Sequence, residues 1–222
     1  MKEKPVSKRP STETTTKKRE PTRETLDVSP TSPHHQLTPK NPLWAIVGMP
    51  GAGKSVIVEH LKSKSWNVVH FGAVTMQELE KRFLVVNETN ERKIREELRK
   101  TYGMEAYARL SIDQIRDDLA KGPTVIDGLY SWSEYKFLRN QLSNRFRVIA
   151  VFTPKDIRYE RLATRQDRPL SYQEAESRDF AEIENLEKGG PIAMADFTLD
   201  NSGSIKSLYS KVDALLNTLL QP

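Results

Sequence analysis

One short segment constrains this chain more than any other. The residues Gly48-Met49-Pro50-Gly51-Ala52-Gly53-Lys54-Ser55 fit the pattern Gly-x-x-x-x-Gly-Lys-Ser. The run before them, Leu43-Trp44-Ala45-Ile46-Val47, is too short and too uniformly apolar for a surface helix, so it predicts a buried parallel strand. From Ser55 onward, apolar residues recur at helical spacing. The sequence therefore predicts a strand, a tight loop and a helix in succession.

This order of elements suits a loop that binds phosphate. Glycines permit the backbone angles that turn successive N–H groups inward, and the N-terminus of the following helix favours an anion. The lysine of such a loop, here Lys54, reaches the β- and γ-phosphates, and the serine, Ser55, supplies a hydroxyl ligand to magnesium. We expect all eight residues from Gly48 to Ser55 to hold a nucleoside triphosphate, ATP or GTP, as its magnesium complex.

The rest of the chain alternates between strand and helix patterns. Further strands are predicted at Asn67 to Phe71, Thr124 to Ile126, Arg147 to Phe152 and Phe197 to Leu199. Further helices are predicted at Thr75 to Phe83, Glu88 to Tyr102, Glu105 to Ala120, Ser133 to Leu142, after Pro154, Ser171 to Lys188 and Ile205 to Leu220. This alternation predicts an α/β fold, a five-stranded parallel sheet with helices on both faces. Such sheets bind ligands beyond the C-terminal ends of their strands, where the glycine loop lies.

The first 42 residues differ in composition from the rest. They hold 9 Lys and Arg against 5 Asp and Glu, are rich in Pro and Thr, and are short of aromatic residues. Such a segment buries too little apolar surface to offset the entropy of ordering. We expect residues 1–42 to be a disordered tail and residues 43–222 to form one catalytic domain. The tail is either a solvated segment without a specific partner or a weak electrostatic tether to a protein.

Charge and composition also narrow the function. The whole chain carries a formal charge of +5, but residues 43–222 hold 26 Lys and Arg against 25 Asp and Glu, which argues against a nucleic-acid surface. There is no cysteine, which excludes disulfides, thiolate metal sites and a cysteine nucleophile. No apolar stretch approaches the roughly 20 residues that span a bilayer, and the N-terminus lacks the apolar core of a secretory signal. We expect a cytoplasmic protein without nucleic-acid or membrane partners.

Asp127 is the candidate carboxylate of the site. Phosphoryl transfer needs a carboxylate to hold the magnesium shell and usually one to position the attacking oxygen. Asp127 ends a predicted strand that should lie beside the loop, so it can serve either role, although Asp-Gly is also a common turn signal. We expect His70 to be a packed or strand-end residue rather than a base, and Trp132 to pack near the substrate pocket.

Arginines cluster after the fourth predicted strand. Arg158, Arg161, Arg165 and Arg168 form the densest basic group of the folded part. Guanidinium groups match phosphate oxygens bidentately and neutralise charge on a transferring group. We expect Arg161, Arg165 or Arg168 to act as a lid arginine, with a salt-bridged surface helix as the alternative, since acidic residues lie close in sequence.

Four segments together resemble P-loop small-molecule kinases of the dephospho-CoA kinase and nucleoside monophosphate kinase group, closest to archaeal dephospho-CoA kinase-like proteins. They are Gly48 to Ser55 with Pro50, Val125 to Gly128, Thr153 through Arg165, and Ala195 through Ser204. The resemblance implies a P-loop NTPase fold and transfer of the γ-phosphoryl group to a small acceptor. It also implies that Lys54, Asp127, Arg161 and Arg165 are catalytic, that Ser55 and Asp127 organise the metal, and that Asn201, Gly203 and Ser204 adjoin the adenine.

The chain departs from this group at two places. Dephospho-CoA kinases carry an aspartate after the second strand that is thought to act on the acceptor hydroxyl, whereas Phe71-Gly72-Ala73 has alanine. Relatives also tend to carry an arginine shortly after the Asp-Gly pair, where this chain reads Leu129-Tyr130-Ser131. The loss of a base need not abolish transfer, because catalysis here is mostly positioning and charge stabilisation. These departures leave the acceptor open.

Two functions of different classes fit the sequence. The first is a magnesium- and ATP-dependent small-molecule kinase, dephospho-CoA kinase-like, whose partners are a nucleotide donor and a nucleotide-like acceptor. The second is a nucleotide-binding regulatory module or slow NTPase, favoured by Ala73 and the long tail. A nucleic-acid enzyme fits less well, because the folded part is close to neutral.

Overall fold

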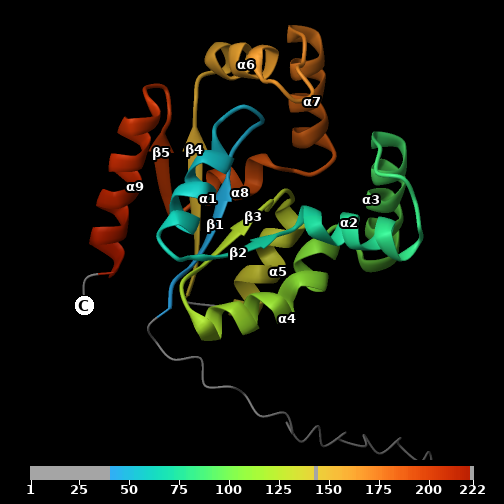
Figure 1. Ribbon diagram of the computed structural model, residues 1–222, viewed down its shortest axis with the longest axis horizontal. Coiled ribbons are helices and arrows are strands. Elements are labelled where there is room, and N and C mark those ends of the chain that lie inside the picture. The colour runs from blue at the N-terminus through green and yellow to red at the C-terminus, as the bar shows by residue number, and fades with distance from the viewer. Residues whose placement is uncertain (1–40, 143–144, 221–222) are drawn as a thin grey trace, which may run out of the picture. The chain divides into compact units, whose positions relative to one another are not determined.

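The computed structural model describes residues 41–142 and 145–220. Within them, five strands form one parallel sheet in the order β2-β3-β1-β4-β5 (Figure 1). The strands are β1 (Leu43–Val47), β2 (Asn67–His70), β3 (Thr124–Asp127), β4 (Phe146–Phe152) and β5 (Phe197–Asp200). This confirms the predicted sheet. The predicted disordered tail lies outside the described residues, except for residues 41 and 42.

The central position of β1 explains its sequence. This strand pairs with β3 on one side and β4 on the other, and all five of its residues are buried. A strand covered on both faces gains from apolar side chains at every position, so its pattern does not alternate. The uniform run from Leu43 to Val47 is therefore the signature of a sheet centre.

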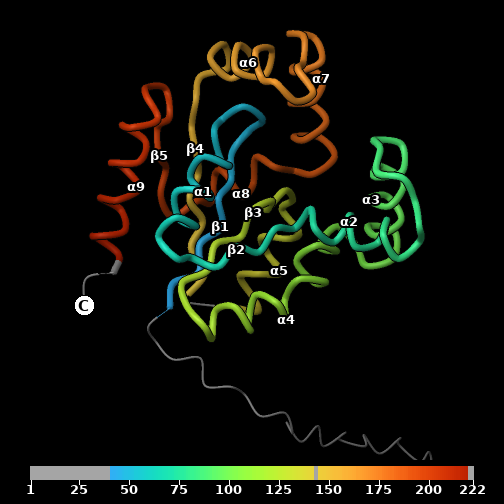
Figure 2. The backbone as a smooth tube through the Cα atoms, in the orientation of Figure 1, coloured from blue at the N-terminus to red at the C-terminus, as the bar shows by residue number. Residues whose placement is uncertain are grey.

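Helices cover both faces of the sheet, as predicted. They are α1 (Lys54–Ser63), α2 (Gly72–Lys81), α3 (Glu88–Tyr102), α4 (Ala106–Lys121), α5 (Trp132–Leu142), α6 (Lys155–Thr164), α7 (Tyr172–Glu184), α8 (Gly189–Ala193) and α9 (Ile205–Leu220). Helices α1 and α9 pack together over one face, as Figure 2 shows in cyan and red, and bury Ile57, Leu61 and Val212. Helices α2 to α5 contribute to the core of the other face, which includes Leu79, Ile94 and Leu138.

Two predicted helix boundaries differ from the structure by more than two residues. Helix α2 begins at Gly72, directly after β2, rather than at Thr75. Helix α7 ends at Glu184 rather than at Lys188, and the short helix α8 follows it. The chain turns between them, because Glu187 adopts a positive φ of 52°. Gly189, Gly190 and Pro191 then disfavour continuation of the first helix.

Parallel pairing places the candidate residues at one edge of the sheet. Asp127, the last residue of β3, is in register with Ile46 of β1, two residues before the glycine loop. On its other side Asp127 is in register with His70, the last residue of β2. The loop after β1 and the ends of β2 and β3 therefore meet at the C-terminal edge, where parallel sheets bind ligands. No helix in the described residues is both long and apolar enough for a membrane crossing.

Candidate phosphate-binding and catalytic site

The glycine loop has the backbone geometry that phosphate binding requires. Gly53 caps α1 with φ +94°, in the left-handed region, and a Cβ built there would lie 2.2 Å from the Nδ2 atom of Asn201. Gly51 has φ +77°, and a Cβ there would lie 2.6 Å from the carbonyl oxygen of Arg158. Both positions therefore exclude a side chain for conformational and steric reasons. The loop leads directly into the N-terminus of α1, the end of a helix that favours anions.

Lys54 lies folded back on this loop. Its ammonium donates hydrogen bonds to the carbonyl oxygens of Gly48, at 2.8 Å, and Met49, at 3.2 Å. Burial and, second, the nearby cation of Lys188 lower the pKa of Lys54 to about 7. A bound polyphosphate would oppose this shift, since an anion favours the charged form of an amine.

Three side chains from other elements bind the loop on the side that faces the rest of the protein. The carbonyl oxygen of Ala52 accepts hydrogen bonds from Asn201 Nδ2, at 2.8 Å, and Thr153 Oγ1, at 3.1 Å. The carbonyl oxygen of Pro50 accepts one from Arg158, at 2.9 Å. These bonds hold loop carbonyls from the protein side, which suits a loop whose N–H groups face a ligand.

Ser55 and Asp127 are the candidate metal ligands. Ser55 is exposed in the first turn of α1, and Asp127 is half-buried at the end of the neighbouring strand β3. In residues 41–142 and 145–220, no three His, Asp or Glu side chains group closely enough to hold a metal ion alone. The donor set fits magnesium, which typically binds one or two protein oxygens and completes its shell with phosphate oxygens and water.

His70 is the partner of Asp127. Its Nδ1 atom lies 3.0 Å from Asp127 Oδ2, and this hydrogen bond raises the pKa of His70 above its ordinary value. Of the two predicted roles, a packed residue or a strand-end residue, the structure confirms the second, and the pairing of His70 with Asp127 was not predicted. Two polar residues ending adjacent parallel strands were the signal that could have revealed the pair.

The four clustered arginines have separate environments. Arg158 is buried and forms a bidentate ion pair with Asp179 of α7, with N–O distances of 2.6 and 3.1 Å. Arg161 lies beside the loop support, where it donates to the carbonyl oxygen of Asn201 at 2.9 Å. Arg165 donates to the carbonyl oxygen of Arg168 in the turn after α6, and Arg168 forms an ion pair with Glu91 of α3 at 3.4 Å. Of the four, Arg158 contacts the loop itself through Pro50, and Arg161 contacts Asn201, which holds the loop. Phosphate binding by Arg161 or Arg165 stays a prediction.

The turn after β5 divides into a buried and an exposed part. Asn201 is buried and contacts the loop, as described above. Gly203 and Ser204 are exposed, and the hydroxyl of Ser204 accepts a hydrogen bond from the N–H of Ser207 at 3.2 Å in the first turn of α9. Asn201 thus has a clear structural role in the loop, while the contact of this turn with adenine stays a prediction.

Two buried groups near the site were missed by sequence reasoning. Glu134 of α5 accepts hydrogen bonds from the N–H groups of Tyr130 and Ser131, at 2.7 and 2.9 Å, and burial raises its pKa to about 7. Glu134 therefore orders the segment that follows Asp127. Lys188 is buried in the turn between α7 and α8. Neither has a sequence signal, because an isolated Glu or Lys usually indicates an exposed side chain.

Comparisons with known proteins agree with this architecture. A family model described as an AAA domain matches residues 45–188. A UPF0200 protein of Thermococcus gammatolerans is 36% identical over 180 residues, which cover 79% of this chain and 94% of that protein. A UPF0200 protein of Thermococcus kodakarensis is 34% identical over 180 residues, with 79% and 96% coverage.

Solved structures share the fold at low identity. The shikimate kinase of Acinetobacter baumannii, solved with shikimate, aligns with a TM-score of 0.54 at 18% identity, over 82% of this chain and 96% of that chain. A likeness at this identity concerns the fold alone, which is that of P-loop kinases. By the family model the chain belongs to the AAA-domain family of P-loop proteins, and by the archaeal relatives it belongs to the UPF0200 proteins.

Proposed function

We propose that this protein is a magnesium- and ATP-dependent small-molecule kinase, dephospho-CoA kinase-like, that transfers the γ-phosphoryl group to a nucleotide-like acceptor. The observation that carries the proposal is that Lys54, on its glycine loop, and Asp127, at the end of the adjacent strand, lie at the same edge of the sheet. The P-loop kinase fold supports the reaction class. The resemblance of the Asp-Gly, arginine and Asn201 segments supports the narrower kinase type.

Each residue of the site has a defined part in this reaction. Lys54 binds the β- and γ-phosphates and neutralises charge that develops on the transferring group. Arg161 of α6, or Arg165 directly after that helix, adds a second positive charge. Ser55 and Asp127 would hold the metal ion, which would supply further positive charge to the phosphate oxygens. The acceptor oxygen bonds to the γ-phosphorus while the bond to the bridging oxygen of the leaving nucleoside diphosphate breaks, and a hydroxyl acceptor releases its proton to water.

Ala73 is compatible with this reaction. It occupies the start of α2, where the resembled kinases carry an aspartate. Phosphoryl transfer depends mainly on positioning and charge stabilisation, so a site without that carboxylate retains the larger part of its catalytic effect. The acceptor of this chain need not be the acceptor of those kinases.

The experiment is a transfer assay with a panel of acceptors. The wild-type chain is incubated with Mg-ATP or Mg-GTP and with dephospho-CoA, nucleosides or nucleoside monophosphates. We expect at least one acceptor to be phosphorylated, and we expect Lys54→Ala to abolish the transfer. Lys62→Ala is the matched control, since Lys62 is an exposed lysine of the same helix that pairs with Glu59 at 3.9 Å.

The same assay can reject the proposal. If no acceptor is phosphorylated and Lys54→Ala binds nucleotide like the wild type, the site is not a kinase site. Tight nucleotide binding without turnover of any acceptor would instead support a nucleotide-binding regulatory module or slow NTPase. Loss of a bound protein on deletion of residues 1–42 would strengthen that alternative.

A further inference from the structure

Lys188 is a buried cation at the edge of the phosphate site. Its residue is only 1% exposed, and its ammonium forms an ion pair with Glu182 of α7. The same ammonium lies 5.1 Å from the ring centroid of Tyr130, in the segment after Asp127. A lysine is rarely buried, because the loss of its hydration is compensated only by close charged or polar partners. This position therefore calls for a physical explanation.

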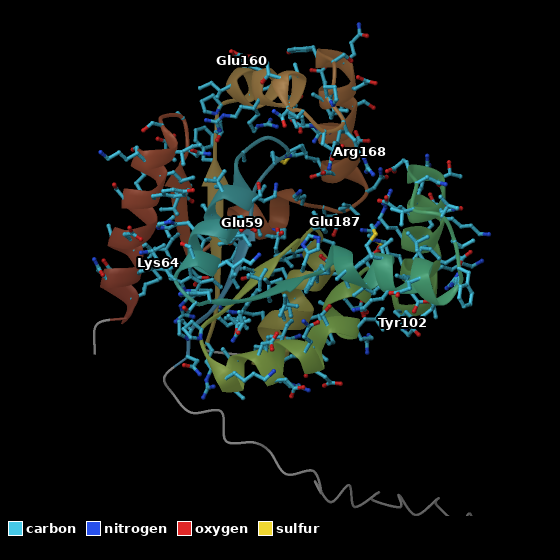
Figure 3. The ribbon with its side chains drawn as sticks, viewed as in Figure 1. Glu59, Lys64, Tyr102, Glu160, Arg168 and Glu187 are labelled. Atoms are coloured by element: carbon cyan, nitrogen blue, oxygen red, sulfur yellow. The ribbon has the colours of Figure 1, made fainter. Side chains whose placement is uncertain are left out.

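The backbone holds Lys188 close to the end of β3. The N–H of Trp132, at the start of α5, donates to the carbonyl oxygen of Leu186 at 3.1 Å. A Cβ built on Gly190 would lie 2.8 Å from the Trp132 ring, so α8 packs tightly against the same place. Figure 3 labels the neighbouring Glu187, an exposed residue, between the end of α7 and the strands. Lys188 thus lies beside the segment that follows Asp127.

The charges around Lys188 are not balanced by its partner. Glu182 also forms an ion pair with Arg178, at 3.3 Å, so one carboxylate faces two cations. The Tyr130 ring that faces Lys188 also contacts the residue after Asp127, since a Cβ built on Gly128 would lie 2.9 Å from it, so Lys188 lies near the edge of the sheet that carries the glycine loop. Two cations therefore share one carboxylate close to this edge of the sheet. Such an excess is unfavourable in a partly dry site until an anion enters.

We propose that Lys188 is a second phosphate-binding lysine of the site. When a triphosphate binds, the ammonium of Lys188 breaks its ion pair with Glu182 and contacts the terminal phosphoryl group. This inference rests on the proposed function, because it assigns a contact within that same site. Glu182 is the counterion that holds Lys188 when the site is without nucleotide. Lys54 spans the β- and γ-phosphates from the loop, and Lys188 approaches the γ-phosphate from the side of β3 and α8. A diphosphate lacks the group that Lys188 contacts.

The first experiment compares triphosphate with diphosphate binding by calorimetry. Lys188→Met should weaken Mg-ATP binding about tenfold or more, as expected for a lost hydrogen bond to a charged group. It should change Mg-ADP binding much less. Lys188→Arg should restore most of the preference for ATP, since it keeps the charge. A stabilising ion pair alone would give equal losses for both nucleotides, and that result would overturn the proposal.

Lys155 offers a matched control. It pairs with Glu176 of α7 at 2.7 Å and lies 5.3 and 5.4 Å from the ring centroids of Tyr159 and Tyr172. Lys155→Met therefore removes the same kind of arrangement, a lysine with a glutamate and a tyrosine ring, away from the glycine loop. We expect it to leave the ratio of ATP to ADP affinity unchanged.

A second variant tests the exchange of partners. Glu182→Gln removes the competing carboxylate with little change of shape, so it should tighten Mg-ATP binding in the wild-type background. The effect should disappear when Lys188→Met is also present. An equal effect of Glu182→Gln in both backgrounds would contradict the exchange.

The outcomes separate this inference from the proposed function. A wild-type chain that binds Mg-ATP but phosphorylates no acceptor defeats the kinase proposal, while the binding comparison still decides the role of Lys188. A wild-type chain that phosphorylates an acceptor, with ATP affinity unchanged in Lys188→Met, defeats only the inference about Lys188. A chain that binds no triphosphate overturns both.

Discussion

The glycine loop and the edge formed by β2 and β3 lie at the same end of one sheet, but they are built in different ways. The loop is shaped by its backbone, whose carbonyl oxygens accept hydrogen bonds from side chains of distant elements, those of Arg158, Thr153 and Asn201. The β2–β3 edge is formed by side chains, of which His70 pairs with Asp127. The nearby segment after β3 is held by Glu134.

This difference assigns a separate task to each region. Backbone N–H groups bind phosphate whatever molecule carries it, so the loop needs rigidity more than variety. Side chains at strand ends can change without disturbing the sheet, so an acceptor site built from them can differ between relatives. Under the proposed function, the loop binds the donor and the β2–β3 edge is where differences in the acceptor are expected.

The largest expected effect comes from the buried support of the loop. Arg158→Met removes the ion pair with Asp179 and the hydrogen bond to Pro50, and it leaves the Asp179 carboxylate in a buried place. Breaking one partner of a buried pair costs about 3–5 kcal/mol in the free energy of unfolding. Urea denaturation measures it. The exposed pair Arg92–Glu96, with an N–O distance of 2.9 Å, supplies the control, because Arg92→Met should leave the stability nearly unchanged. Equal stability of the two variants would show that Arg158 is not a structural support.

An intermediate effect is expected at the β2–β3 edge. Asp127→Asn keeps the shape of the side chain but removes its charge, so turnover with Mg-ATP should fall on the order of 100-fold, about 2.7 kcal/mol of transition-state stabilisation. The fold should remain intact. Asp213→Asn is the matched control, since Asp213 also pairs with a histidine, His60, at 2.8 Å, on helices away from this edge. Similar turnover in both variants would exclude Asp127 from the chemistry.

The same variant has a signature in its pH dependence. The carboxylate of Asp127 raises the pKa of His70, so Asp127→Asn should lower it, as an NMR titration of the ring would show. A histidine whose pKa is raised by folding stabilises the protein at every pH below its ordinary pKa, and this stabilisation is lost as the pH rises through its pKa in the folded state. Asp127→Asn should therefore reduce the free energy of unfolding at a pH below the ordinary histidine pKa and leave it unchanged at a pH above the pKa of His70 in the folded protein.

The sheet and the glycine loop could be predicted from the sequence, whereas the environments of single side chains on the helices could not. Uniform apolar runs identify buried parallel strands, and their order along the chain places Asp127 beside the loop, so the sheet and the loop were predictable. Helix faces were harder to assign. Arg158, Arg161 and Arg165 read as one basic cluster, but spacing alone does not say that Arg158 is buried beneath the loop while Arg165 lies in a turn.

The turn between α7 and α8 shows a second limit. The residues from Ser171 to Lys188 are dense in Glu and favour one continuous helix, but α7 ends at Glu184 and the chain turns at Glu187, which takes a left-handed conformation. After this turn, the ammonium of Lys188 lies against the Glu182 carboxylate and the Tyr130 ring. A contact that depends on one unusual backbone angle has no periodic signal in the sequence, so it becomes visible only in the structure.

The smallest expected effect comes from the hydrogen bond between Asn201 and the loop. Asn201→Ala removes the hydrogen bond to the carbonyl oxygen of Ala52, which retains the one from Thr153, so the free energy of unfolding should fall by about 1 kcal/mol. Asn67→Ala is the matched control, because Asn67 Nδ2 donates to the carbonyl oxygen of Asp118 at the same distance of 2.8 Å, outside the loop. The two variants should lose similar stability, but only Asn201→Ala should weaken nucleotide binding in calorimetry. If both leave binding unchanged, the loop does not need this support to hold its shape, and the rigid character assigned to the donor side would be wrong.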